Sequence, residues 1–137
     1  MDSSRLHFRP LTLEDYQHLR ATTEWEKLED AQVEQALQNE LFSVCVCYND
    51  QPIGMGRVVG DGAIYFYVQD VIVHPKFKGK GIGRMIMQEI EKYLNETISQ
   101  YAFVGLMAAQ GVAAFYHQFG YSKRPMKGPG MFKIVQK

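Results

Sequence analysis

The sequence has few of the residues that mark several common classes of protein. Its 137 residues include only two cysteines, Cys45 and Cys47, which lie two positions apart on one apparent strand. Side chains alternate along a strand, so both thiols are expected on one face, too close in sequence for ordinary disulfide geometry. Two thiols are also too few for a zinc cage. We therefore expect reduced, buried cysteines and no metal site.

The sequence also lacks net charge and long apolar runs. Fifteen basic and fifteen acidic residues cancel, which argues against a broad nucleic-acid surface. No segment has the length and apolar character of a membrane span, and residues 1–5 lack the apolar region of a signal peptide. A cytoplasmic protein with neither a nucleic-acid nor a membrane partner is the expectation.

The spacing of apolar residues predicts a single α/β domain over residues 1–137. Alternation, turn residues and β-branched runs indicate a mixed, mostly antiparallel sheet flanked by helices on both sides. The expected strands are residues 5–9, 42–48, 53–59, 64–73, 101–106 and 131–135. Two helices are expected to begin at the caps Thr12 and Asp30, and two more are expected over residues 82–95 and 112–119.

The chain is organised around the strand of residues 64–73 and the glycine-rich segment after it. The strand is almost wholly β-branched or aromatic, and Pro75 ends it because proline has no N–H for a ladder. The segment 78–84 reads Lys-Gly-Lys-Gly-Ile-Gly-Arg and leads into the amphipathic helix of residues 82–95. Glycines let backbone N–H groups turn inward, and a helix N-terminus adds unpaired N–H groups and a positive dipole end. This combination predicts a phosphate or pyrophosphate site.

Two common phosphate-binding motifs are excluded by the spacing. A P-loop requires Ser or Thr after its Gly-Lys pair, whereas Lys80 is followed by Gly81. The dinucleotide fingerprint G-x-G-x-x-G requires glycine where Arg84 stands.

The segment resembles the acetyl-coenzyme A loop of the GCN5-related N-acetyltransferases (GNAT family), Arg/Gln-x-x-Gly-x-Gly/Ala. This chain has Lys78-x-x-Gly81-x-Gly83, with lysine in place of arginine or glutamine, preceded by a strand ending similar to the family's, residues 71–75. Downstream, residues 115–121 are similar to the family's Tyr-x-x-x-Gly-Phe segment, with Tyr121 in place of phenylalanine.

This resemblance implies the acyl-CoA N-acyltransferase fold and acetyl-CoA as co-substrate. It implies that the pantetheine arm bonds the backbone of the strand, and that the pyrophosphate takes the N–H groups of the loop. The implied cofactor-binding residues are Val71, Ile72, Val73, Lys78, Gly79, Lys80, Gly81, Ile82, Gly83 and Arg84. Tyr116 matches the family's general acid, which would protonate the departing thiolate.

No general base is assigned. Tyr67 and Gln69 occupy strand positions where many family members carry Glu or His, and alternation places both on one side with Val71. The nearest carboxylate, Asp70, is expected on the other side unless a bulge re-aims it. A water relay would need no dedicated base.

The sequence is interpreted as an N-acetyltransferase that moves acetyl from acetyl-CoA to a primary amine of a small molecule, by direct attack in a ternary complex. The acceptor is left open. An apolar or cationic amine could be bound by a pocket lined by Trp25, Tyr16, Tyr65 and Tyr67, and an anionic group by Lys123, Arg124 and Lys127, although these residues equally fit core packing and a solvated loop. Two alternatives remain: a non-catalytic acyl-CoA-binding sensor, and a protein lysine acetyltransferase. A homodimer is possible.

Overall fold

A five-stranded sheet forms the centre of the first of two compact units. The computed structural model describes all residues, 1–137, and separates them into residues 1–107 and 108–137. The strands are β1 (Leu6–Arg9), β2 (Phe42–Tyr48), β3 (Gln51–Gly60), β4 (Tyr65–Val73) and β5 (Phe103–Gly105). They lie in the order β1-β2-β3-β4-β5, antiparallel except for the parallel pair β4–β5. The mixed, mostly antiparallel α/β fold is confirmed, and the single domain stays a prediction.

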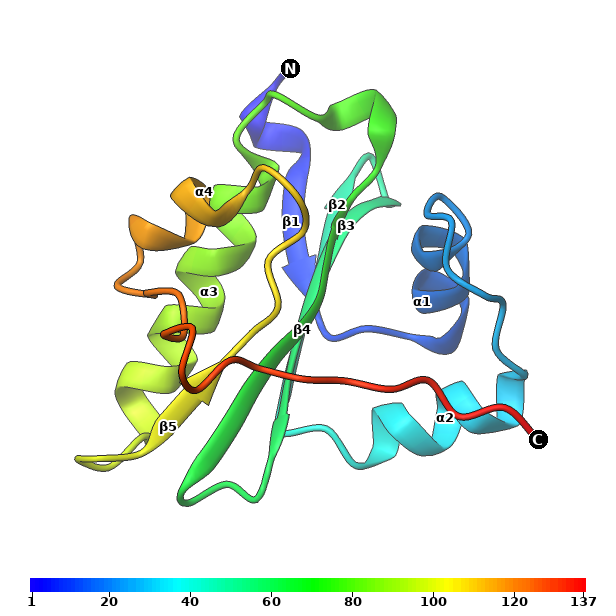
Figure 1. Cartoon of the computed structure of the whole chain (residues 1–137). Coiled ribbons are helices and arrows are strands. Elements are labelled where there is room, and N and C mark those ends of the chain that lie inside the picture. The colour runs from blue at the N-terminus through cyan, green and yellow to red at the C-terminus, as the bar shows by residue number, and fades with distance from the viewer. The chain divides into compact units, whose positions relative to one another are not determined.

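Helices cover both faces of this sheet (Figure 1). Helix α3 (Ile82–Thr97) packs on one face, and α1 (Leu13–Arg20) and α2 (Asp30–Gln38) lie on the other. The close approach of α3 depends on Gly54 and Gly56 in β3. A Cβ at Gly56 would lie 2.6 Å from Ile86 Cγ2 on α3, closer than packed atoms approach. A larger residue at Gly54 or Gly56 would therefore require the isoleucine side chains of α3 that pack there to shift.

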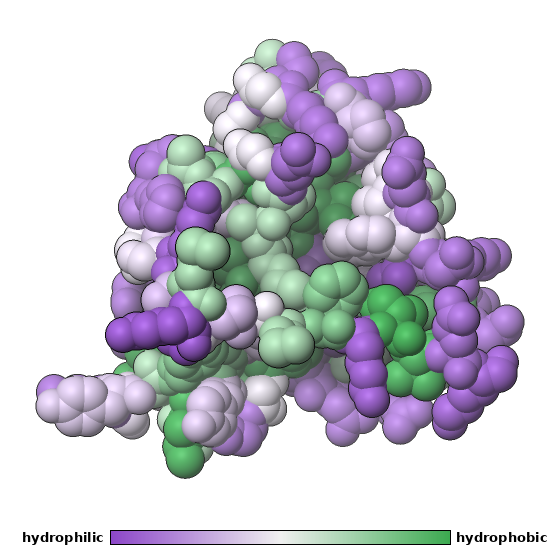
Figure 2. Space-filling view, viewed as in Figure 1, coloured by the Kyte–Doolittle hydropathy of each residue, from purple (hydrophilic) through white to green (hydrophobic).

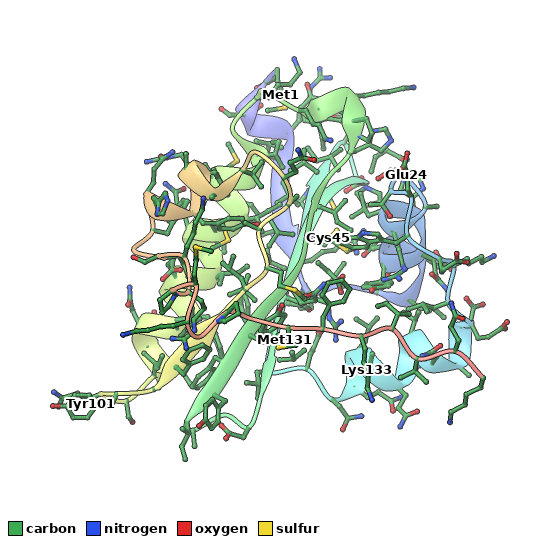
Figure 3. All side chains as sticks on the ribbon, in the orientation of Figure 1. Met1, Glu24, Cys45, Tyr101, Met131 and Lys133 are labelled. Carbon is green, nitrogen blue, oxygen red and sulfur yellow. The ribbon has the colours of Figure 1, made fainter.

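The opposite face carries a compact apolar core beneath α1 and α2. Its buried members are Leu11, Tyr16, Leu19, Val33, Cys45, Cys47, Met55 and Ile72. Figure 3 shows Cys45 on the sheet beside α1. The two cysteines are free and buried, with their Sγ atoms 3.8 Å apart. Burial, reinforced by Cys47, raises the pKa of the Cys45 thiol, which therefore stays protonated and packs as an apolar side chain.

A β-bulge interrupts β4 at Asp70. Between the pairs Met55–Ile72 and Arg57–Gln69, β3 advances two residues while β4 advances three. Asp70 takes the extra position with a φ of 57°, in the left-handed region. As a result Gln69 and Asp70 both face α1.

The bulge corrects one expectation from alternation. Val71 was expected on one side with Tyr67 and Gln69, but it faces α3. Its Cγ2 lies 3.7 Å from the position of a Cβ on Gly56, where Ile86 and Ile90 of α3 also pack.

The second unit, residues 108–137, contains the short helix α4 (Ala113–His117). The chain turns after it at Gly120, whose φ of 91° suits glycine. The strand expected over residues 131–135 is wrong: this segment forms no strand, and Met131 and Phe132 are 89% and 74% exposed. Its apolar, β-branched composition favours extended backbone, but a strand also requires a neighbour with which to pair.

None of the helices combines the length and the apolar character that a membrane span requires. The surface is mixed, with hydrophobic residues in green among hydrophilic ones in purple (Figure 2). Large apolar side chains exposed on the first unit include Ile64, Tyr65 and Tyr101. Figure 3 shows Tyr101 extending outward from its loop.

Candidate active site

The glycine-rich segment forms an open turn between β4 and α3. Gly79 and Gly81 have φ angles of 78° and 82°, and Gly83 lies inside the first turn of α3. A Cβ at Gly79 or Gly81 would meet no other atom within 4 Å. The positive φ angles, rather than crowding by the protein, therefore account for glycine at these two positions.

The N-terminus of α3 is left uncapped by side chains. Gly81 is the N-cap and offers no side-chain acceptor, so the first N–H groups of the helix remain available. Ile82 is 1% exposed and anchors this end of the helix to the sheet. Lys78 and Lys80 are exposed beside it. An N-terminus without a side-chain cap, the positive end of the helix dipole and two lysines together favour an anionic ligand.

Strand β4 extends well past its partner on this side of the sheet. The pairing of β4 with β5 covers Tyr65, Phe66 and Tyr67, and ends there. The rest of β4, through Val73, runs on beyond the three residues of β5. The segment Val71–Val73 thus lies on an edge to which an extended ligand can bond as a further strand.

These features fit the two chemically different parts of acetyl-CoA. The uncovered edge of β4 suits the amide groups of the pantetheine arm, and the glycine turn with the α3 N-terminus suits the pyrophosphate. The structure brings Val71–Val73 and Lys78–Arg84 together as consecutive parts of one unit. The assignment of these residues to acetyl-CoA stays a prediction.

Asp70 belongs to a buried ionic network. Its Oδ2 atom accepts hydrogen bonds from Arg57 Nη1 and from the Tyr16 hydroxyl, both at 3.0 Å. Arg57 Nε also donates to Glu40 Oε1 at 2.8 Å. Burial alone would lower the pKa of Arg57, but the hydrogen bonds with Glu40 and Asp70 outweigh it and raise that pKa. Asp70 is thus the partner of a permanent cation at the bulge, which makes it a poor free base.

Tyr67 has a buried hydroxyl without a hydrogen-bond partner. Burial raises the pKa of this phenol, so it remains protonated at neutral pH. A buried hydroxyl with no partner loses its hydration without compensation, which is unusual in a folded protein. On the same side of β4, Gln69 donates its Nε2 to Asp70 Oδ1 at 3.3 Å.

Tyr116 lies in α4 of the second unit. Its ring contacts Phe115 and Tyr121, with centroids 5.1 Å and 6.3 Å away. Burial raises the pKa of the Tyr116 phenol, which therefore keeps its proton at neutral pH. A protonated phenol is the state that a general acid needs, and the catalytic role of Tyr116 remains a prediction.

Sequence reasoning missed the Arg57–Asp70 pair, although a signal was present. Arg57 is the only charged residue in β3, and Asp70 is the only one in β4. Two opposite charges on adjacent apolar strands are expected to pair because neither can be buried alone. It also missed a hollow of about 480 Å³ beside α1, of whose lining it had singled out only Trp25.

Comparison with known proteins identifies the family of this chain. The model of the acetyltransferase (GNAT) family matches residues 7–121. The uncharacterized N-acetyltransferase ycf52 of Porphyra purpurea is 31% identical over 80 residues, 58% of this chain and 45% of that protein. The chloroplastic serotonin N-acetyltransferase 2 of Oryza sativa subsp. japonica is 33% identical over 82 residues, 59% of this chain and 40% of that protein.

A solved structure extends the similarity to nearly the whole chain. The probable acetyltransferase SA2161 of methicillin-resistant Staphylococcus aureus is 31% identical, with a TM-score of 0.86, and the match covers 95% of this chain and 98% of that one. Against four ycf52 relatives, the chain spans between 45% and 71% of their length. The family match over residues 7–121 and the shared fold lead to one conclusion: the chain belongs to the GNAT family of acetyl-CoA-dependent N-acetyltransferases.

Proposed function

We propose that this protein transfers the acetyl group of acetyl-CoA to a primary amine of a small molecule, by direct attack in a ternary complex. The observation that carries this proposal is the uncovered edge of β4, which leads directly into the glycine turn and the uncapped N-terminus of α3. The amine nitrogen attacks the thioester carbonyl, the carbon–sulfur bond breaks, and the departing thiolate takes up a proton.

Two groups of this chain would assist the chemistry. A backbone N–H of β4 near the bulge would polarise the thioester carbonyl, and Tyr116 would supply the proton to the thiolate. The first step also requires a neutral amine. Asp70 is engaged by Arg57 and Tyr16, and neither Tyr67 nor Gln69 is a base at neutral pH. A water relay to solvent is therefore the proposed route for the ammonium proton.

A covalent acetyl-cysteine route is not proposed. Cys45 and Cys47 are both fully buried in the core between the sheet and α1. The raised pKa of Cys45 also keeps that thiol protonated and unreactive. Buried thiols of this kind fit a reducing compartment such as the cytoplasm. The Oryza relative is described as chloroplastic, and the chloroplast is therefore a second candidate compartment. Localisation of the tagged protein would distinguish the two compartments.

An acetylation assay over a panel of primary amines tests this function, with release of free thiol as the readout. We expect turnover of at least one small amine. Initial velocities measured against acetyl-CoA and this amine should give the intersecting pattern of a ternary complex. Calorimetric binding of acetyl-CoA with no turnover on any small amine would instead support an acyl-CoA sensor. Turnover on lysine-containing peptides alone would support a protein acetyltransferase.

A further inference from the structure

A hollow beside α1 is the most distinctive feature that the proposed reaction does not yet use. Its volume is about 480 Å³, and it lies where the chain leaves α1 and continues toward α2. Its lining consists of Gln17, His18, Arg20, Ala21, Thr23, Trp25 and Lys27. Figure 3 shows the same connection, with Glu24 labelled in it.

The charged side chains that line this hollow are all basic. Arg20 and Lys27 are the charged members, and the neighbouring Glu24 and Glu26 are not part of the lining. The two positive charges of the lining favour an anion, and Asp30, whose Oδ1 accepts from Gln17 Nε2 at 3.0 Å, lies beside the hollow but outside its lining. This sign is notable in a chain whose overall charge is zero. The hollow therefore suits the end of a ligand that carries negative charge, not the end that carries the amine.

Arg20 is held in place for such a ligand. Its Nε donates to the Glu26 carbonyl oxygen at 2.9 Å, and its Nη1 donates to the Tyr16 hydroxyl at 3.0 Å. The guanidinium also lies over the Trp25 ring, 5.3 Å from its centroid. These contacts leave Nη2 without an acceptor on the protein. A guanidinium fixed on two sides loses little side-chain entropy when it binds a carboxylate or phosphate.

Trp25 adds a planar apolar surface to this cation. The side chain is 47% exposed, so part of the ring is open to a ligand. An aromatic ring and a guanidinium at one place favour a flat ligand that bears an anionic substituent.

The hollow is connected to the end of the catalytic strand. Tyr16, which accepts from Arg20, donates its own proton to Asp70 at the β4 bulge, 3.0 Å away. On the other side, the ring of His18 stacks with that of His74 at 6.0 Å between centroids. His74 follows β4 directly and caps the turn before the glycine segment. A ligand seated against Arg20 and Trp25 therefore lies next to the strand at which the thioester is proposed to bind.

We propose that this hollow binds the non-reacting end of the acceptor, and that the acceptor is a primary amine on a planar group bearing a carboxylate or phosphate. The role of the ligand as acetyl acceptor rests on the proposed function. The binding of a planar anion does not, and it can be measured without turnover. Arg20 and Lys27 supply the charge, and Trp25 supplies the stacking surface.

Matched substrates test the specificity. 4-(Aminomethyl)benzoate, its phosphonate analogue and neutral benzylamine share a ring and an aminomethyl group. We expect kcat/KM for at least one anionic amine to exceed that for benzylamine by tenfold or more, and the better anion identifies the preferred group. In Arg20→Gln and Lys27→Gln this ratio should fall severalfold or more toward one. Lys92→Gln, which removes an equal charge from the exposed surface of α3, should retain the wild-type ratio. A wild-type ratio near one, or an equal fall in all three variants, would overturn the assignment.

A binding measurement separates this inference from the proposed function. Trp25 is the only tryptophan, so intrinsic tryptophan fluorescence reports on the hollow alone. Titration with 4-methylbenzoate and 4-methylphenylphosphonate, which have no amine, should change this fluorescence saturably for at least one anion, and 4-methylbenzamide should not. Lys27→Gln should weaken the response, and it removes no hydrogen bond that supports the fold. Saturable anion binding without turnover of any amine would retain the anion site and refute the acceptor role. No saturable response to either anion would refute the site.

Discussion

Replacement of Asp70 tests whether the buried ion pair maintains the bulge in β4. In the structure the side chains of Arg57 and Asp70 are 8% and 3% exposed, so neither charge can recover hydration if the other is removed. Removal of one partner from a buried pair typically costs about 3–5 kcal/mol. Arg57 would keep Glu40 Oε1 at 2.8 Å and the Ala36 carbonyl at 3.3 Å, which favours the lower end, about 3 kcal/mol.

Backbone strain adds to that loss in Asp70→Ala. The φ of Asp70 is 57°, and an alanine in the left-handed region is disfavoured by about 1–2 kcal/mol. The expected loss in the free energy of unfolding is therefore about 4–5 kcal/mol, a large part of the ~5–15 kcal/mol of an ordinary domain. Asp70→Asn is the matched control. Asparagine adopts positive φ readily and keeps an oxygen acceptor for Arg57, so we expect a loss of only about 1–2 kcal/mol.

Urea denaturation followed by far-UV circular dichroism measures both variants, with the m-value as a check that unfolding remains two-state. The order of stability should be wild type, then Asp70→Asn, then Asp70→Ala. An alanine variant within about 1 kcal/mol of wild type would show that Arg57 is satisfied by Glu40 and Ala36 alone, and that the pair does not maintain the bulge.

Three further predictions address the glycine turn, the proposed general acid Tyr116 and the stability of α1 at low pH. Gly81→Asp should retain the fold, because a Cβ there meets no other atom within 4 Å and the φ of 82° costs a residue other than glycine only about 1–2 kcal/mol. It should weaken acetyl-CoA binding by more than tenfold in calorimetry through repulsion of the pyrophosphate. Equal affinity would exclude the loop as the pyrophosphate site. Tyr116→Phe should lower kcat and kcat/KM together by roughly 10²-fold in stopped-flow assays of the chemical step, with acetyl-CoA affinity retained. Wild-type turnover would leave Tyr116 as a packing residue. Burial alone would raise the pKa of Asp15, but hydrogen bonds from Arg9 and Thr12 outweigh it and lower that pKa. This stabilisation is present above the unfolded-state pKa of about 3.9 and is lost as the pH falls below it. Asp15→Asn should therefore be less stable than wild type at pH 7, and the difference should shrink toward pH 3 in urea denaturation. A difference that stays constant with pH would contradict the role of that carboxylate.

The sequence was informative wherever a local pattern determined the structure. The alternation of residues 42–48 predicted β2 with the bounds that the structure has, and the glycine spacing located the turn before α3. Thr12 was expected to cap α1, and its hydroxyl accepts from the Asp15 N–H at 3.2 Å. In each case the deciding interaction lies within a few residues of the pattern that indicated it.

Features that depend on distant partners were not predictable in the same way. The sequence left the bulge at Asp70 as an open alternative. The reason is that the side chain of Asp70 bonds with distant residues, Arg57 on β3 and Tyr16 on α1. The strand expected over residues 131–135 failed for a related reason. Its composition predicts extended backbone but contains no information on whether a sheet edge is available. The hollow beside α1 is lined by residues of one short segment, 17–27, but only the fold of that segment shows that their side chains surround a common space.

The two glycines of β3 have a consequence for how this protein can tolerate change. Gly54 and Gly56 set the distance between the sheet and α3, and the N-terminus of α3 is the proposed pyrophosphate site. A methyl group at Gly54 would meet Ile82 Cγ2 at 2.9 Å, and Ile82 is the first residue of that helix. Substitutions at these two glycines would thus act on the proposed anion site through the side chains of α3 that pack against them. Substitutions that change the packing of β3 against α3 should therefore also change the affinity for acetyl-CoA. Variants selected for a change in either property should show a change in both.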